Sequence, residues 1–164
     1  MILGFSTKFP KGKGTLSGKK TFFINKIMKS IWLNFPKETN EFSDEKISVF
    51  NSEKLTPKIH TIRVDKNSRW KVGNDIHFSI NVRTKKMFRF APIIKVKSIQ
   101  KIEIVHRGIV GERKANIYID NVIIGIDEME QLAINDGFDS VENFFEWFSN
   151  DFTGKIIHWT DLKY

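Results

Sequence analysis

The sequence predicts an α+β fold in which short antiparallel strands form a small β-barrel and helices pack beside it. Two observations support this prediction. Apolar residues alternate with polar residues from Ile76 to Val82, which is typical of a strand with one buried face. Helical apolar faces occur only before and after this strand-rich middle of the chain. The regular strand–helix alternation of a doubly wound parallel sheet is therefore missing.

The N-terminal part is predicted to hold a short strand, a basic loop and a helix. Residues 8–20 carry five lysines and no acidic residue, and they run directly into the helical segment. The residues that share one apolar helical face are Ile24, Ile27, Met28, Ile31 and Phe35. Pro36 ends this helix, and residues 36–57 predict a long polar connection.

The middle of the chain is predicted to supply most of the strands. After the strand at 76–82, residues 87–105 hold one long bent strand or two strands. Asp120 and Asn121 lie between two short apolar runs, and both residue types tolerate positive φ. A tight hairpin is therefore expected over residues 117–124.

The C-terminal part is predicted to be helical before it closes the sheet. Capping-box spacings start one helix at Asp127 and a second at Asp139. Gly137 lies where the first of these helices needs a left-handed residue at its end. Residues 156–159 are apolar and predict the closing strand.

Length and composition predict one domain over residues 1–164. The chain has no cysteine, which excludes disulfides, thiolate zinc sites, iron–sulfur clusters and a cysteine nucleophile. No apolar run approaches the roughly 20 residues that cross a bilayer. The first residues lack the basic flank and cleavage site of a signal peptide. We therefore expect a cytoplasmic protein that is not associated with a membrane.

The charge is unevenly distributed along the chain. The net charge is +8, but residues 1–119 hold 25 Lys and Arg against 9 Asp and Glu, and residues 120–164 hold 2 against 10. A basic body with an acidic segment predicts a polyanionic partner, such as nucleic acid or a nucleotide-like ligand. The alternative is that the acidic segment packs against the basic one.

The common phosphate-binding and metal-binding motifs are absent. Gly18 and Lys19 resemble part of a phosphate-binding loop, but Lys13 replaces its first glycine and Lys20 its Ser or Thr. Lysines beside a helix start can still hold a phosphate; a solvated flexible loop is the alternative. The four histidines show no metal-ligand spacing, so we expect neither a metal nor a cofactor.

Residues 83–90 interleave four basic residues with two phenylalanines. Single-stranded nucleic acid favours this mixture of backbone charge and stacking rings. The same segment also fits a hairpin with a solvated tip and its phenylalanines turned inward. The candidate nucleic-acid contacts in the two basic segments are Lys19, Lys20, Lys85, Lys86 and Arg89.

Three features of the middle and C-terminal parts occur together. Lys58, Thr61 and Arg63 form a Lys-x-x-Thr-x-Arg segment, residues 73–75 (Gly-Asn-Asp) form a glycine turn before a strand, and residues 132–138 form an acidic helix end. With this combination, the chain resembles the ASCH domain family, relatives of the PUA-like RNA-binding barrels. In that family the glycine turn is Gly-Asp, one residue shorter than here.

The resemblance covers residues 55–160 and implies a PUA-like barrel that binds RNA, DNA or a modified nucleotide in a basic cleft. Residues 1–50 would then be a family-variable extension. Thr61 and Arg63 share strand parity, so both can face one cleft, and Lys58 joins them if the chain turns at its entry. Arg63 would bind the ligand, and Trp70 would line the pocket, stack on a base or belong to the core.

The family also contains amidohydrolases that act on N-acylated cytidine nucleosides. That resemblance implies that Lys58 activates Thr61 as the nucleophile and that Asp136 takes the place of a catalytic Glu. The aspartate is one methylene shorter, which would set its carboxylate back by about 1.5 Å. A purely structural alternative pairs Lys58 and Arg63 with acids such as Asp65 or Asp136. A further alternative is a non-catalytic module that binds a protein partner.

Overall fold

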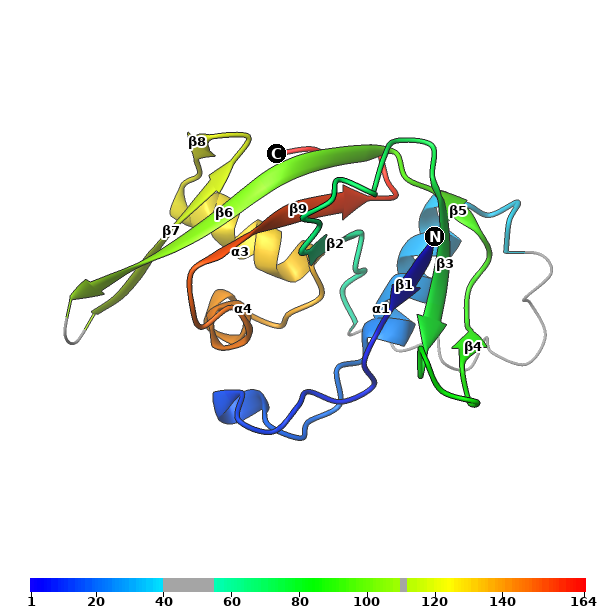
Figure 1. The fold of residues 1–164 in the computed structure, drawn as a ribbon, viewed down its shortest axis with the longest axis horizontal. Helices are drawn as coiled ribbons and strands as arrows, with labels where there is room; N and C mark the ends of the chain where they lie inside the picture. Colours follow the sequence, from blue (N-terminus) through cyan, green and yellow to red (C-terminus); the bar gives the residue numbers. More distant parts are fainter. Residues whose placement is uncertain (40–54, 110–111) are drawn as a thin grey trace.

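The computed structural model describes residues 1–39, 55–109 and 112–164. The strands are β1 (Ile2–Gly4), β2 (His60–Arg63), β3 (Asp75–Ile80), β4 (Phe88–Arg89), β5 (Ile94–Lys95), β6 (Ser98–Ile109), β7 (Glu112–Ile119), β8 (Val122–Ile123) and β9 (Phe152–His158). The helices are η1, a 3-10 helix (Gly14–Leu16), α1 (Phe23–Asn34), α3 (Ile126–Asn135) and α4 (Val141–Trp147). The predicted α+β class is confirmed (Figure 1).

The strands form two sheets. The larger one has the order β2-β9-β6-β7-β8 and is antiparallel throughout, with α3 and α4 beside it (Figure 1). In the smaller one, β3 pairs with β1, β4 and β5, and α1 lies behind it in this view. The predicted hairpin is confirmed, because β7 and β8 are joined by Asp120 and Asn121 at φ values of 50° and 71°.

The prediction of an entirely antiparallel strand set was wrong for the N-terminus. β1 runs parallel to β3, with Leu3 opposite Phe78. Residues 87–105 also contribute three strands, β4, β5 and the start of β6, rather than one or two. β5 pairs in the smaller sheet and β6 in the larger, so the chain crosses between the sheets there. Within the described residues no ladder joins the two sheets into a closed barrel, and the barrel stays a prediction.

An aromatic core joins α1 to both sheets. Trp159 is fully buried just after β9, and its ring meets that of Phe78 of β3 edge-on at 5.2 Å. The Trp159 indole N–H donates to Ser30 Oγ of α1 over 3.1 Å, which satisfies its polar atom in the core. Phe5 and Phe90 pack on the Phe78 ring and extend the core to the rim of the smaller sheet.

The helix boundaries agree with the sequence to within a few residues. α1 ends before Pro36, as predicted, and Gly137 takes up the expected left-handed conformation after α3, with φ +89°. The two predicted helix starts, Asp127 and Asp139, differ by one or two residues from the observed N-caps. α3 starts after Gly125, whose N–H donates to Glu128, and α4 starts after Ser140, whose hydroxyl accepts from the Asn143 N–H. None of the helices in the described part of the chain is long and apolar enough to cross a membrane.

The close packing at Gly137 predicts a large cost for adding one methyl group. A Cβ on Gly137 would lie 3.0 Å from Lys58 Cδ and 3.2 Å from the Phe23 ring, whereas Gly18, with φ +73°, has nothing within 4 Å. We expect Gly18→Ala to lower the free energy of unfolding by about 1 kcal/mol through backbone strain alone. Gly137→Ala should cost about 3 kcal/mol, because overpacking adds to that strain. Equal losses in urea unfolding would contradict the packing.

Candidate functional site

The predicted site is centred on a buried ion pair between Lys58 and Asp136. Lys58 lies two residues before β2, and its Nζ is 2.5 Å from Asp136 Oδ1 and also donates to the Asp136 main-chain carbonyl. The two residues are only 1% and 4% exposed. The structure therefore brings together two of the three residues of the expected catalytic set.

The pair has a clear structural role at the end of α3. The last carbonyls of a helix lack partners within it and carry the negative end of the helix dipole. Lys58 Nζ binds the carbonyl of Asp136, and Lys26 Nζ binds that of Gly137 at 2.8 Å and the Asp139 carboxylate at 2.5 Å. Two lysines thus cap this helix end, and the Lys58–Asp136 pair is the one that the structural alternative expected for Lys58.

Burial changes the ionisation of both partners. It lowers the pKa of Lys58 from 10.5 to about 8, although the Asp136 carboxylate opposes this change. Burial also raises the pKa of Asp136, while Lys58 and Arg63 act in the opposite direction. An ammonium with a pKa near 8 releases its proton far more readily than an exposed lysine does.

Thr61 and Arg63 lie on β2, and their shared strand parity is confirmed. Thr61 is buried opposite Ile157 of β9. Among the described residues, no hydrogen bond joins its hydroxyl to Lys58 or Asp136. Arg63 is only partly buried, because its side chain leaves the strand toward β1. Its Nη2 donates to the Gly4 carbonyl over 2.8 Å, and its guanidinium lies 5.1 Å from the centre of the Phe5 ring.

Trp70 belongs to the core, which was one of the three alternatives for it. It is 7% exposed, and its main-chain N–H donates to Asp65 Oδ2 over 3.0 Å. Asp65 also accepts from the Arg69 N–H, and Lys155 Nζ lies 3.6 Å from its carboxylate. The alternative that Asp65 pairs with Lys58 or Arg63 therefore finds no support in these contacts.

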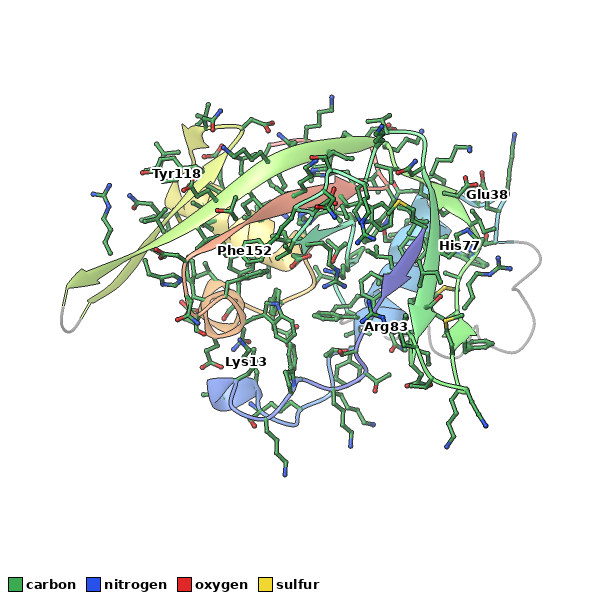
Figure 2. All side chains as sticks on the ribbon, viewed as in Figure 1. Lys13, Glu38, His77, Arg83, Tyr118 and Phe152 are labelled. Atoms are coloured by element: carbon green, nitrogen blue, oxygen red, sulfur yellow. The ribbon has the colours of Figure 1, made fainter. Side chains whose placement is uncertain are left out.

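The predicted nucleic-acid contacts of the basic loop and the basic turn are all exposed. Lys19 and Lys20 end the basic loop, and Lys85 and Lys86 follow β3 in a turn. Figure 2 labels one cation on each of these segments, Lys13 and Arg83, both in the lower half of the view. Arg89 is exposed on β4 beside the turn. Of the two phenylalanines there, Phe90 turns inward and Phe88 stays 51% exposed, so the inward-facing alternative holds for one ring only.

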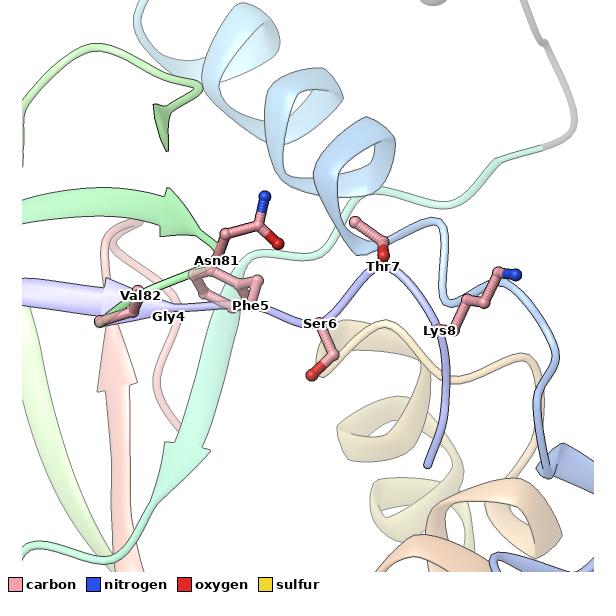
Figure 3. Close-up of a pocket in the computed structure, with 7 residues that line it drawn as sticks. All are labelled: Gly4, Phe5, Ser6, Thr7, Lys8, Asn81 and Val82. Carbon is pink, nitrogen blue, oxygen red and sulfur yellow. The ribbon is translucent and has the colours of Figure 1, made fainter. Parts of the chain in front are cut away.

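A cavity lies between these two basic segments. It has a volume of about 430 Å³ and is lined by Gly4, Phe5, Ser6, Thr7, Lys8, Asn81 and Val82 (Figure 3). Lys8 belongs to the basic loop, and Asn81 and Val82 begin the basic turn. Gly4 allows the turn to approach β1, because a Cβ there would be 3.0 Å from Val82 Cγ2. Arg63 does not line this cavity, but it contacts two residues that do, Gly4 and Phe5.

The acidic segment neutralises only part of the basic one. Within the described residues, three lysines of the basic part form ion pairs with it: Lys26 with Asp139, Lys58 with Asp136 and Lys97 with Asp161. Glu146 of α4 contacts η1 instead, accepting from the Thr15 hydroxyl and the Leu16 N–H. The cations around the cavity form no ion pair with a described residue.

Sequence reasoning missed a buried polar cluster on the other face of β2. His60 and His158 are register partners with ring centres 5.2 Å apart, and burial lowers both their pKa values, that of His158 to about 4. His60 Nε2 is 2.8 Å from the Tyr164 hydroxyl, which also accepts from Asn135 Nδ2 over 2.8 Å. Each histidine lies two residues from a buried isoleucine of its strand and so on the same face. This alternation was the sequence signal that could have predicted their burial. In the described part of the chain no cluster of His, Asp and Glu is arranged to hold a metal ion.

The ion pair predicts how stability depends on pH. Between pH 8 and 10.5 the unfolded chain keeps the Lys58 proton that the folded chain has released, so the free energy of unfolding rises with pH. The matched reference is Lys58→Met/Asp136→Asn, which lacks both titrating groups. We expect the difference in urea-derived free energy between wild type and this variant to increase across that range. A difference that is constant or decreases would contradict the lowered pKa.

No protein-family model matches this chain, and searches of curated proteins and of solved structures found no match.

Proposed function

We propose that this chain binds nucleic acid or a nucleotide-like ligand at the end of the molecule where its two basic segments meet. The observation that carries the proposal is the 430 Å³ cavity between residues 4–8 and residues 81–82. Its wall offers the Ser6 and Thr7 hydroxyls and the Lys8 ammonium, which suit the phosphates and polar edges of a nucleotide.

The charge around this cavity supports the same proposal. The lysines and arginines of both segments are exposed except Lys13, which is half-buried and donates to the Trp147 carbonyl, and none of them forms an ion pair with an acid of the described chain. Such a concentration of free cations attracts a polyanion and raises its rate of association. The ion pairs that do form lie elsewhere, in the core at Lys58 and Lys26 and on the surface at three other lysines. The charge at this end therefore remains available to a ligand.

The resemblance to the ASCH family gives independent support. The family's Lys-x-x-Thr-x-Arg segment falls on β2 and its approach, and the acidic helix end falls at the end of α3, in contact with it. A PUA-like barrel is the fold that we propose on this basis. Arg63 contacts Gly4 and Phe5 of the cavity wall, and Lys58 supports the strand that carries Arg63.

Binding should depend strongly on salt and on the basic turn. We expect Lys85→Ala/Lys86→Ala to weaken binding of a 12-nucleotide RNA or DNA several-fold and to reduce the slope of log K against log salt by about 1 to 2. The matched control is Lys66→Ala/Lys71→Ala, which removes two exposed lysines remote in sequence from both basic segments. Fluorescence anisotropy at several salt concentrations measures both quantities.

Two outcomes would count against the proposal. Folded wild-type protein that binds no RNA or DNA at low salt would remove it. Equal losses in the turn variant and the control would show that net charge, rather than this surface, determines binding.

A second candidate function is hydrolysis of an N-acylated cytidine nucleoside. The lowered pKa of Lys58 and its contact with Asp136 favour it, because a base acts best with a pKa near the working pH. Against it, neither of the two cavities described is lined by Lys58, Thr61 or Asp136. Binding is therefore the function that the geometry supports better.

The hydrolase candidate has a direct test. It predicts that the wild-type protein releases the acyl group from an N-acylated cytidine nucleoside, which chromatography of the products measures. The Thr61→Ala variant should lose this activity. Thr153→Ala, which changes an exposed threonine on β9, should retain it. Absence of turnover across a panel of acylated nucleosides, with protein shown to be folded, would exclude this candidate.

A further inference from the structure

A second cavity continues the first along the basic loop. It has a volume of about 360 Å³ and is lined by Thr7, Lys8, Lys20, Thr21, Phe22, Phe23, Ile24 and Asn25. The two cavities share Thr7 and Lys8 in their walls and so adjoin each other, between the turn after β3 and the start of α1; we refer to the two together as the groove. Thr21 fixes this part of the wall, because its hydroxyl donates to the Ser6 carbonyl over 2.6 Å and accepts from the Phe23 N–H.

Two lysines lie side by side in the wall of this second cavity. Lys8 and Lys20 are partners in an isolated antiparallel bridge. The flanking hydrogen bonds, Phe9 N–H to Lys19 O and Thr21 N–H to Thr7 O, show that the bridge is a non-hydrogen-bonded pair, in which side chains are closest. Like charges directly opposite each other destabilise such a pair. An anion bound between the two ammonium groups would remove this repulsion.

The same cavity contains an exposed aromatic ring on a strained backbone. Phe22 has φ 54° and ψ 13°, a left-handed conformation that is rare for a bulky residue, and it is 46% exposed. The reversal directs Phe23 into the core against Phe9 and Phe138 and leaves the Phe22 ring at the cavity. Strain of this kind persists where the surrounding structure imposes it, and it is concentrated at functional sites.

We propose that this groove binds single-stranded nucleic acid, with one base stacked on Phe22 and a backbone phosphate between Lys8 and Lys20. The neighbouring nucleotide then occupies the first cavity, beside the Ser6 hydroxyl and Asn81. This proposal rests on the proposed nucleic-acid function and specifies its ligand. A base can stack on a side chain only when it has left its neighbours, so the site selects single strands over duplexes.

Because the backbone at Phe22 is strained, one substitution there can separate an effect on binding affinity from an effect on stability. Phe22→Gly removes the ring and also relieves the positive φ, so its melting temperature should equal or exceed that of wild type. Its affinity for a 12-nucleotide oligo-dT should nevertheless fall about 5- to 100-fold. Trp32→Ala, which removes another exposed aromatic ring from α1, should leave the affinity unchanged.

An abasic 12-mer with the same number of phosphates separates stacking from charge. Phe22→Gly and wild type should bind it equally, since no base is present to stack. Lys8→Ala/Lys20→Ala should weaken binding of both oligomers and reduce the salt slope by about 0.7 for each phosphate that is no longer neutralised by a lysine. The duplex of oligo-dT with oligo-dA should bind more weakly than the single strand at the same salt.

The outcomes distinguish this inference from the proposed function. Full affinity of Phe22→Gly for oligo-dT, tighter binding of the duplex, or equal binding of oligo-dT and the abasic 12-mer would overturn the stacking site and leave nucleic-acid binding in place. Tighter binding of polyglutamate than of oligo-dT would overturn it in favour of an acidic peptide. No binding of wild type to any nucleic acid would overturn both proposals.

Discussion

The buried Lys58–Asp136 ion pair is the interaction on which the arrangement of this molecule depends. It joins the entry of β2 to the end of α3, and the Lys58 N–H also donates to the Lys26 carbonyl of α1 over 3.0 Å. Removing one partner of such a pair leaves an uncompensated charge in the core, which costs about 3–5 kcal/mol. The pair therefore holds β2 in place. Arg63 lies on β2, and its side chain contacts the Gly4 carbonyl and the Phe5 ring, both of which belong to the wall of the first cavity.

The cations of this chain fall into two groups with different physical roles. Lys26 and Lys58 are buried, and their charges are satisfied by carboxylates and by the carbonyls at the end of α3. The cations of the basic loop and the basic turn, apart from the half-buried Lys13, are exposed, and no described carboxylate pairs with them. A charge that is already neutralised within the core contributes to stability, whereas an unmatched charge on the surface contributes to recognition. The binding that we propose at the basic end is thus separable from folding at the core.

Local residue patterns predicted the helix ends and the turns, but they did not predict which strands pair over long distances in the sequence. The helix before Pro36, the turn at Asp120 and Asn121 and the left-handed Gly137 all follow from the residues that form them. The parallel pairing of β1 with β3 depends on contacts between residues 75 positions apart, for which a single sequence carries no signal. The meeting of Lys58 with Asp136 was expected from a family resemblance. The strained Phe22 was not expected, because it arises from how the basic loop joins the core.

The contact between α3 and β2 also protects the edge of the larger sheet. β2 pairs with β9 on one side only, so its outer side could accept a strand from another molecule. The Asp136 carboxylate accepts a hydrogen bond from the Ile62 N–H over 3.3 Å, and the Asn135 carbonyl accepts one from the Ile59 N–H over 3.0 Å. A helix end thus occupies the hydrogen-bonding groups that edge-to-edge self-association would use. The same carboxylate that neutralises a buried ammonium thus also occupies an N–H that a strand from a neighbouring copy would need for pairing along this edge.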